Sequence, residues 1–128
     1  MNYTNKVVVI TGATSGIGEA CAAVFGAAGA KLVITGRNAQ KLEATAAKLQ
    51  AMNLTVLPIL ADAGSEADNK RMAEEALAAF GRIDILINNA GISMRALFQD
   101  LDLEVFRKVM DTNFWGTVLP PNIACRPF

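Results

Sequence analysis

The sequence predicts an α/β fold with a doubly wound parallel sheet. Segments with the pattern of buried strands alternate with amphipathic helical segments along the 128 residues, and the links between them are short. Such alternation implies right-handed βαβ units, with helices covering both faces of the sheet. A glycine-rich turn at residues 11–18 follows the first strand directly, where the chain must turn into a helix.

The apolar periodicity predicts four strands and four helices. The strands are expected over residues 6–10, 31–35, 55–61 and 83–88. The helices are expected over residues 16–28, 39–52 and 65–80, and the fourth begins near residue 102. Because the glycine turn follows the first strand, the expected sheet order is 3-2-1-4. This is the order of a Rossmann-type fold, here truncated and without its later strands.

Particular residues in the first half justify the elements there. The first strand contains four consecutive β-branched residues, which suits a strand buried on both faces. On the following helix, Ile17, Cys21 and Val24 share one apolar face, so we expect that face to be buried. The third strand contains Pro58, which has no N–H group to donate to a neighbouring strand. We therefore expect this strand at an edge of the sheet.

In the second half, polar residues mark where elements begin and end. Residues 65–68 resemble a capping box that opens the third helix, and Gly81 ends it. The fourth strand runs into the polar residues 88–91. In the last helix Asn113 follows Met110 at helical spacing, so we expect its side chain on the buried face. A buried amide without partners would cost about 1–3 kcal/mol.

Composition limits the classes of protein to which the chain can belong. At 128 residues it is one domain or part of one, and 52% apolar residues suffice for a core. The net charge is zero and there is no basic block, so nothing supports nucleic-acid binding. No apolar run could span a membrane, and the polar residues 1–6 do not resemble a secretory signal, so we expect a cytoplasmic protein. The absence of histidine, with only Cys21 and Cys125, indicates neither a metal site nor a disulfide framework.

The turn at residues 11–18 has the glycines that a phosphate-binding turn needs. Gly12 can adopt the conformation of the turn, Gly16 lets the main chain approach a diphosphate, and Gly18 allows tight packing between helix and strand. The N–H groups and the positive dipole end of the following helix point at the same place. Glu19 stands where a nucleoside-triphosphate loop would have lysine, which excludes a P-loop phosphotransferase. A plain glycine-rich turn is the other interpretation.

Four motifs together resemble the first half of a short-chain dehydrogenase/reductase, over residues 6 to about 118. They are residues 11–18, Asp62, residues 88–91 and residues 113–116. The cofactor-binding residues that this resemblance implies are Gly12, Thr14, Ser15, Gly16, Ile17, Gly18, Arg37, Asp62, Asn89, Ala90 and Gly91.

The resemblance also implies a role for individual residues. Asp62 would accept a hydrogen bond from the adenine amino group; a solvated loop aspartate is the alternative. Asn88 would brace the sheet, while the backbone of residues 89–91 would lie beside the cofactor ribose. Arg37 follows the second strand, where a carboxylate would favour NAD(H). A guanidinium there suits a 2′-phosphate and favours NADP(H) over NAD(H), unless it is an ordinary surface arginine.

For catalysis, the resemblance implies that Asn113 distorts its helix and binds a water that relays protons to the active-site lysine. The family further needs a serine and a Tyr-x-x-x-Lys pair, while hydride passes between the nicotinamide and an alcohol or carbonyl substrate. Tyr3 is the only tyrosine, no serine follows Ser93, and no lysine follows Lys108. We therefore expect the chain on its own to be inactive.

Residues 119–128 are expected to form an aberrant tail after a partial dinucleotide-binding domain over residues 1–118. Prolines at positions 120 and 121 interrupt helical hydrogen bonding, so we expect the last helix to stop near Val118. We hypothesise that the tail is translated out of frame, because restoring one nucleotide in a permitted codon set yields a continuation that looks normal for the family. An alternative transcript or a naturally divergent tail would explain the same residues.

Two functions from different classes are open at this point. The first is an NAD(P)(H)-dependent oxidoreductase of the short-chain dehydrogenase/reductase type, inactive as this truncated chain. The second is a non-catalytic dinucleotide-binding or interaction module. Relatives commonly associate through the helix after the fourth strand, so the resemblance also allows a homo-oligomer.

Overall fold

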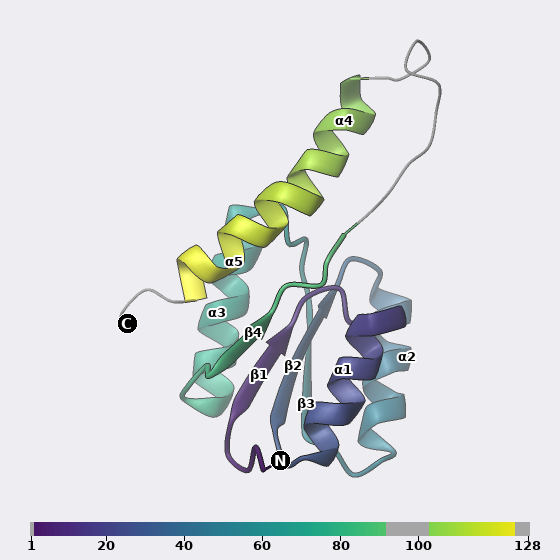
Figure 1. Cartoon of the computed structure of the whole chain (residues 1–128), viewed down its shortest axis with the longest axis vertical. Helices are drawn as coiled ribbons and strands as arrows, with labels where there is room; N and C mark the ends of the chain where they lie inside the picture. Colours follow the sequence, from purple (N-terminus) through teal and green to yellow (C-terminus); the bar gives the residue numbers. More distant parts are fainter. Residues whose placement is uncertain (1, 92–102, 125–128) are drawn as a thin grey trace.

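The computed structural model describes residues 2–91 and 103–124. Its elements are β1 (Val7–Ile10), α1 (Gly16–Ala27), β2 (Lys31–Gly36), α2 (Ala39–Gln50), β3 (Val56–Leu60), α3 (Glu66–Phe80), β4 (Ile85–Ile87), α4 (Leu103–Met110) and α5 (Gly116–Ala124). A π-helical segment, Asp111–Trp115, joins α4 to α5. The four strands form one parallel sheet in the order β3-β2-β1-β4 (Figure 1). The predicted fold class and sheet order are confirmed.

β1 lies between β2 and β4, and all four of its residues are fully buried. Because side chains alternate along a strand, those of β1 divide between two core layers. Val8 and Ile10 belong to the layer beneath α1 and α2, whereas Val7 and Val9 belong to the layer beneath α3. Figure 1 shows these helices on opposite faces of the sheet. The sheet is therefore doubly wound, as predicted.

The prediction from Pro58 is also confirmed. β3 is an edge strand, and Pro58 pairs with Ile34 of β2 on its inner side. A proline at an edge leaves no ladder bond unmade on the outer side of the strand. β4 forms the opposite edge of the described sheet and contains only three residues, all half-buried.

The predicted buried face of α1 is wrong. The buried residues of this helix are Gly18, Ala22 and Gly26. Ile17 and Val24 are instead 75% and 64% exposed, and Cys21 is partly buried at the border of the core. Small residues face the sheet because they let the helix axis come close to it. Both faces of α1 carry apolar residues, so periodicity alone could not separate them.

The expectation that the last helix stops near Val118 is also wrong, because α5 continues through Pro120 and Pro121. Pro121 has no N–H group to donate to the carbonyl of Thr117, four residues earlier. That carbonyl instead accepts a hydrogen bond from Asn88 Nδ2 at 3.3 Å. A side chain from the end of β4 thus supplies a donor that the proline removes. The out-of-frame origin of residues 119–128 stays a hypothesis.

The longest described helix, α3, has 15 residues. Within residues 2–91 and 103–124, no helix has the length and apolar character needed to cross a membrane.

Candidate functional site

A cleft of about 200 Å³ opens where the chain leaves the carboxyl ends of the parallel strands. Ligands of open α/β sheets bind in this position, because several connecting loops converge there. The cleft is lined by Gly12, Thr14, Ser15, Thr35, Gly36, Arg37, Ala61, Ala63, Asn89, Ala90, Gly91 and Thr112. Most of the predicted cofactor-binding residues are therefore brought together around one cavity.

The glycine turn forms one wall of this cleft. Gly12 has φ +65°, and a Cβ added there would lie only 2.7 Å from Ala90 Cα. Gly16 has φ +58°, and nothing lies within 4 Å of a Cβ added to it. Ser15 precedes α1 with an extended backbone, and its side chain makes no capping hydrogen bond. The turn therefore packs tightly on its inner side and leaves open space beside the N-terminus of α1.

Gly18 and Asn89 support the turn from below. Asn89 Nδ2 donates a hydrogen bond to the Gly12 carbonyl at 2.9 Å. A Cβ on Gly18 would lie 2.5 Å from that same Nδ2 atom and 2.6 Å from the Gly12 oxygen. Gly18 is thus needed for close packing, as predicted, but its neighbours are the turn and Asn89 rather than a strand.

Thr11, the first residue of the turn at residues 11–18, joins the ends of β1 and β4, a role that the motif did not predict. Thr11 is fully buried, and its Oγ1 accepts hydrogen bonds from the backbone N–H groups of Asn89 and Ala90, both at 3.1 Å. Its own N–H donates to the Ile87 carbonyl at 3.1 Å. A hydroxyl at the end of an otherwise apolar buried strand was the available signal, since buried polar atoms need partners.

Asn88 does not brace neighbouring strands as expected. Its side chain is exposed and reaches the carbonyl of Thr117 in α5. Thr11 and Asn89 make the contacts between β1 and β4 instead. In a three-residue strand, Asn88 already lies beyond the last ladder pair, Ile10 with Ile87.

Arg37 lies at the mouth of the cleft, just before Asn38, whose side chain caps α2 by accepting from the Lys41 N–H. Its side chain is exposed and has no hydrogen-bond or ion-pair partner among the described residues. Arg37 also lines a second cleft, of about 480 Å³, with Asp62 and residues of α4. The α4 residues there include Arg107 and Lys108.

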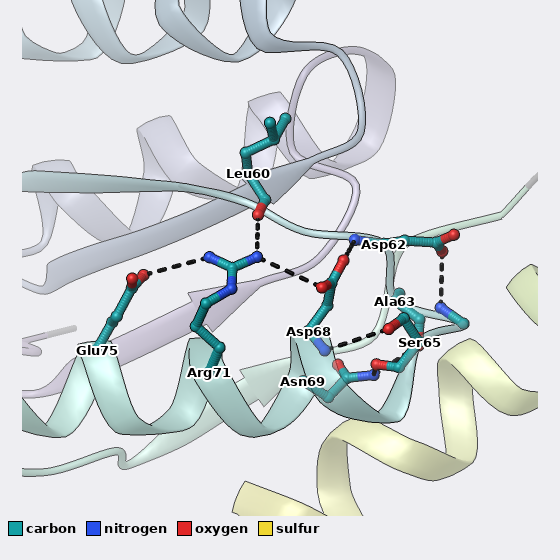
Figure 2. A network of polar contacts seen from close by, with 9 residues as sticks. Leu60, Asp62, Ala63, Ser65, Asp68, Asn69, Arg71 and Glu75 are labelled. Carbon is teal, nitrogen blue, oxygen red and sulfur yellow. Dashed lines mark hydrogen bonds and ion pairs between the residues drawn. The ribbon is translucent and has the colours of Figure 1, made fainter.

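Asp62 is not a freely solvated loop residue. Its Oδ1 accepts a hydrogen bond from the Gly64 N–H at 2.9 Å, and its own N–H donates to Asp68 Oδ2 at 2.8 Å (Figure 2). Asp62 lines the second cleft and another, of about 390 Å³, on the α3 side. Arg37 lines both, so these two residues border the same region.

The predicted burial of Asn113 is wrong, because its side chain is exposed. Asn113 lies in the π-helical segment, whose wider turn shifts the face that follows it. Thr112 and Gly116 face the body of the domain instead, and Thr112 is 4% exposed. The implied helix distortion is present at this residue. Asn113 also lies near Gly91, since a Cβ on Gly91 would be 3.3 Å from its Oδ1.

Ile17 and Gly18 lie beside the cleft rather than in its lining. Ile17 is 75% exposed next to the open side of the turn.

The four motifs are close in space, because all of them lie at the carboxyl end of the parallel strands. They are the glycine turn, Asp62, the end of β4 and the distorted helix at Asn113. The short chain dehydrogenase family model matches residues 6–126. The chain belongs to this family.

Curated short-chain dehydrogenases resemble the chain over most of its length. Dehydrogenase/reductase SDR family member 7B from Bos taurus is 49% identical over 123 residues, covering 89% of this chain and 37% of the relative. The uncharacterized oxidoreductase YxnA from Bacillus subtilis is 37% identical over 124 residues, covering 97% of this chain and 35% of the relative. The chain therefore spans about a third of the length of these relatives.

Solved short-chain dehydrogenases have the same arrangement of elements. A short-chain type dehydrogenase/reductase from Mycobacterium marinum is 31% identical with a TM-score of 0.92, covering 98% of this chain and 51% of that one. A short chain dehydrogenase from Burkholderia cenocepacia in complex with NADP is 29% identical with a TM-score of 0.91, covering 98% of this chain and 52% of that one. The chain corresponds to about half of each structure, and the family binds NAD or NADP.

Proposed function

We propose that this chain is the nucleotide-binding part of an NADP(H)-dependent oxidoreductase. The full-length protein would exchange hydride between an alcohol or carbonyl substrate and the nicotinamide. The observation that carries the proposal is the glycine cradle, where a Cβ on Gly12 or Gly18 would overlap the Ala90 backbone or the Asn89 amide. A backbone-lined cradle at a helix N-terminus is shaped for a diphosphate.

Different residues of the chain bind different parts of the dinucleotide. The N–H groups at the start of α1 bind the diphosphate, the backbone of residues 89–91 lies beside a ribose, and Asp62 accepts from the adenine amino group. When bound, the nicotinamide supplies the hydride donor or acceptor. Asn113, near Gly91, holds a water for proton relay in the full-length form.

The guanidinium of Arg37 supports a preference for NADP(H). Arg37 has no carboxylate partner among the described residues, and residues 36–38 contain no acidic side chain to meet ribose hydroxyls. The rest of the cleft lining carries no excess positive charge, because Arg107 and Lys108 are balanced by the carboxylates of Asp62, Glu104 and Asp111. Arg107 is also paired with Glu104 at 3.1 Å. A planar guanidinium without a partner suits bidentate contact with a 2′-phosphate.

The chain on its own is proposed to bind the dinucleotide without turnover. Its single tyrosine, Tyr3, precedes β1 and packs edge-on against Phe25, at 5.0 Å between ring centroids. The proton donor that the family uses is thus not among these 128 residues. The cytoplasmic location expected from the sequence stays a prediction.

Titration of the purified chain with NADPH and NADH, followed by nicotinamide fluorescence, tests the proposal. We expect NADPH to bind about tenfold more tightly than NADH or better, because a charge-assisted contact contributes about 1.5–3 kcal/mol. No turnover is expected with alcohol or carbonyl substrates. Absence of binding would contradict the nucleotide site itself, equal affinities would contradict only the preference, and turnover would contradict the inactivity of the isolated chain.

A second function, association with another copy of the chain, is favoured by the apolar side of the last helices. Four apolar residues there are exposed, namely Leu103, Met110, Phe114 and Val118, with exposures of 70%, 49%, 48% and 39%. Trp115 stacks edge-on against Phe114 at 5.1 Å between ring centroids and is itself 45% exposed. Large exposed apolar faces mark interaction surfaces, and we propose that a second copy covers this one.

Sedimentation of wild-type chain and two variants tests this association. Phe114→Glu puts a charge into the apolar face, whereas Met52→Glu changes a residue of similar exposure, 51% against 48%, just beyond α2. We expect wild type and the Met52 variant to sediment as dimers, and the Phe114 variant as a monomer. A monomeric wild-type chain would overturn the proposal, as would a dimer that survives Phe114→Glu.

A further inference from the structure

The loop between β3 and α3, residues 61–65, depends on Asp68 in the first turn of α3 (Figure 2). Asp68 Oδ2 accepts a hydrogen bond from the Asp62 N–H at 2.8 Å. The Asp68 N–H in turn donates to Ser65 Oγ at 3.2 Å, which caps α3 as predicted. One residue of the helix therefore holds both the first and the last part of the loop.

Asn69 holds the middle of the same loop. Its side chain is 1% exposed, and its Nδ2 donates to the carbonyls of Ala63 and Ser65 at 2.7 and 2.8 Å. A buried amide is destabilising unless its hydrogen-bonding groups are paired, and an apolar residue of similar size would fill the space without that requirement. The two hydrogen bonds of Asn69 therefore determine the path of the loop rather than simply filling the core.

These contacts fix the direction of the Asp62 carboxylate. Its Oδ1 accepts from the Gly64 N–H at 2.9 Å, so the side chain is held against its own loop. The loop beneath it is held by Asp68 and Asn69, whose contacts determine where the second carboxylate oxygen points. That oxygen has no partner among the residues of the described chain, and Asp62 borders the clefts that it shares with Arg37.

We propose that Asn69 and Asp68 are positioning residues for adenine recognition, acting through Asp62. The inference rests on the proposed function, because adenine reaches Asp62 only if the cleft binds the dinucleotide. A carboxylate oxygen held in one direction accepts the adenine amino group and repels a carbonyl oxygen in its place. Loosening the loop lets the carboxylate turn away, so selectivity for the amino group declines more than affinity for the rest of the dinucleotide.

Arg71 completes the arrangement on the outer side. Its guanidinium donates to the Leu60 carbonyl and forms ion pairs with Asp68 at 3.6 Å and Glu75 at 3.7 Å (Figure 2). The residue before the loop is thus tied to the residue that holds Asp62. Because Arg71 is more exposed than Asn69, its contribution to the position of Asp62 is smaller.

The test compares NADPH with its hypoxanthine analogue, in which a carbonyl replaces the adenine amino group. The variants are Asn69→Leu, which removes both donors at similar size, and Asp68→Ala, which removes the acceptor for the Asp62 N–H. Asp68→Asn keeps an acceptor oxygen and serves as the conservative rescue. Lys70→Ala, at the exposed position directly after Asn69, is the matched control. Melting curves establish which variants are folded.

We expect wild type and the Lys70 variant to prefer NADPH over the analogue by about tenfold. The folded Asn69→Leu and Asp68→Ala variants should bind both nucleotides nearly equally, and Asp68→Asn should recover most of the preference. A merely structural role would weaken the binding of both nucleotides equally and leave the ratio of their affinities unchanged. That result would overturn the inference. If Asn69→Leu does not fold, the two Asp68 variants decide the outcome.

Failure of the proposed function has a different signature. A wild-type chain that binds neither nucleotide contradicts the dinucleotide site itself. A wild-type chain that binds NADPH and the analogue equally keeps the site but overturns the role of Asp62 and its supports. Preserved selectivity in folded Asp68→Ala and Asn69→Leu variants overturns only the positioning role.

Discussion

The amide of Asn89 donates a hydrogen bond to the carbonyl of Gly12 over 2.9 Å, which joins the end of β4 to the turn after β1. Gly18 lies directly beneath this bond, with no room for a side chain. Two of the family motifs, residues 11–18 and residues 88–91, are thus in contact through Gly12, Gly18 and Asn89. The shape of the glycine turn depends on the end of a strand that lies far away in the sequence.

Gly18→Ala tests this contact. The substitution should destabilise the chain, although alanine has a higher helix propensity than glycine. Alanine at an interior helix position normally stabilises by about 1 kcal/mol relative to glycine. Here the added Cβ would lie 2.5 Å from Asn89 Nδ2, and such overpacking costs about 1–3 kcal/mol. Urea unfolding should show lower stability, and NADPH titration should show weaker binding.

Ala20→Ser, at an exposed position of the same helix, is the control and should change neither measurement. A Gly18→Ala chain that is more stable than wild type and binds NADPH normally would show that the turn and Asn89 can move apart freely.

Thr11→Val should lower the free energy of unfolding by about 2–3 kcal/mol. Valine has nearly the same shape, but it leaves the N–H groups of Asn89 and Ala90 without the oxygen that they share. Denaturant unfolding measures the loss, and Thr11→Ser, which keeps the hydroxyl, should recover most of it. Equal stability of the valine variant and wild type would mean that water replaces the Thr11 oxygen at no cost.

The sheet order and the glycine turn could be predicted from sequence because each has a local cause. Four β-branched residues before the glycine turn require a strand buried on both faces, and Pro58 requires an edge. The capping role of Ser65 is equally local, since an N-cap hydroxyl lies within reach of the N–H three residues later, here that of Asp68. These features need no knowledge of distant contacts.

The orientation of Asn113 could not be predicted, because it depends on the π-helical segment. A sequence pattern assumes a regular helical period, and one wider turn moves every following side chain to another face. Close packing adds a second reason, since Gly64 lies so near this segment that an added Cβ would be 2.5 Å from the Asp111 carbonyl oxygen. That contact joins residues far apart in the chain and leaves no periodic signal.

The prediction that the last helix stops before Pro120 and Pro121 was wrong for a similar reason. The rule that prolines interrupt a helix assumes that the lost hydrogen bonds remain unmade. Here the Thr117 carbonyl accepts a hydrogen bond from Asn88 Nδ2 instead. Only the three-dimensional position of Asn88, one residue beyond β4, makes this substitution of donors possible.

Arg37→Gln should reduce the preference for NADPH over NADH to near unity. The change removes the charge at an exposed site without a protein partner, so stability should remain within about 0.5 kcal/mol of wild type. Paired titrations with both cofactors at two salt concentrations measure the effect, because a phosphate contact weakens with salt. Arg107→Gln is the matched control, since Arg107 lines the same cleft but is already paired with Glu104.

If Arg37→Gln weakens NADPH and NADH equally, the guanidinium contacts a part that both cofactors share. If Arg107→Gln alone removes the preference, the 2′-phosphate lies on the α4 side of the second cleft.

Asp84 should make the stability of the chain depend on pH under acidic conditions. The hydrogen bond from Arg82, supported by the Val7 N–H at 2.8 Å, outweighs burial and holds the pKa of the Asp84 carboxyl below its ordinary value of 3.8. A carboxyl with a lowered pKa in the folded state contributes stability that is fully present above about pH 4. That contribution is lost as the pH falls below the ordinary pKa and through the lowered one.

Asp84→Asn should remove this part of the acid dependence while keeping an oxygen that can accept from Val7. Urea unfolding between pH 2.5 and pH 7 measures the acid dependence. The stability difference between wild type and variant should be largest at neutral pH and smallest at the acid end. The whole effect should be about 1 kcal/mol or less, because the ion pair is partly solvated. Glu66→Gln, in the exposed first turn of α3, is the control for a simple loss of negative charge. A difference between wild type and Asp84→Asn that stays constant across this range would show that ionisation of Asp84 does not contribute to the acid dependence of stability.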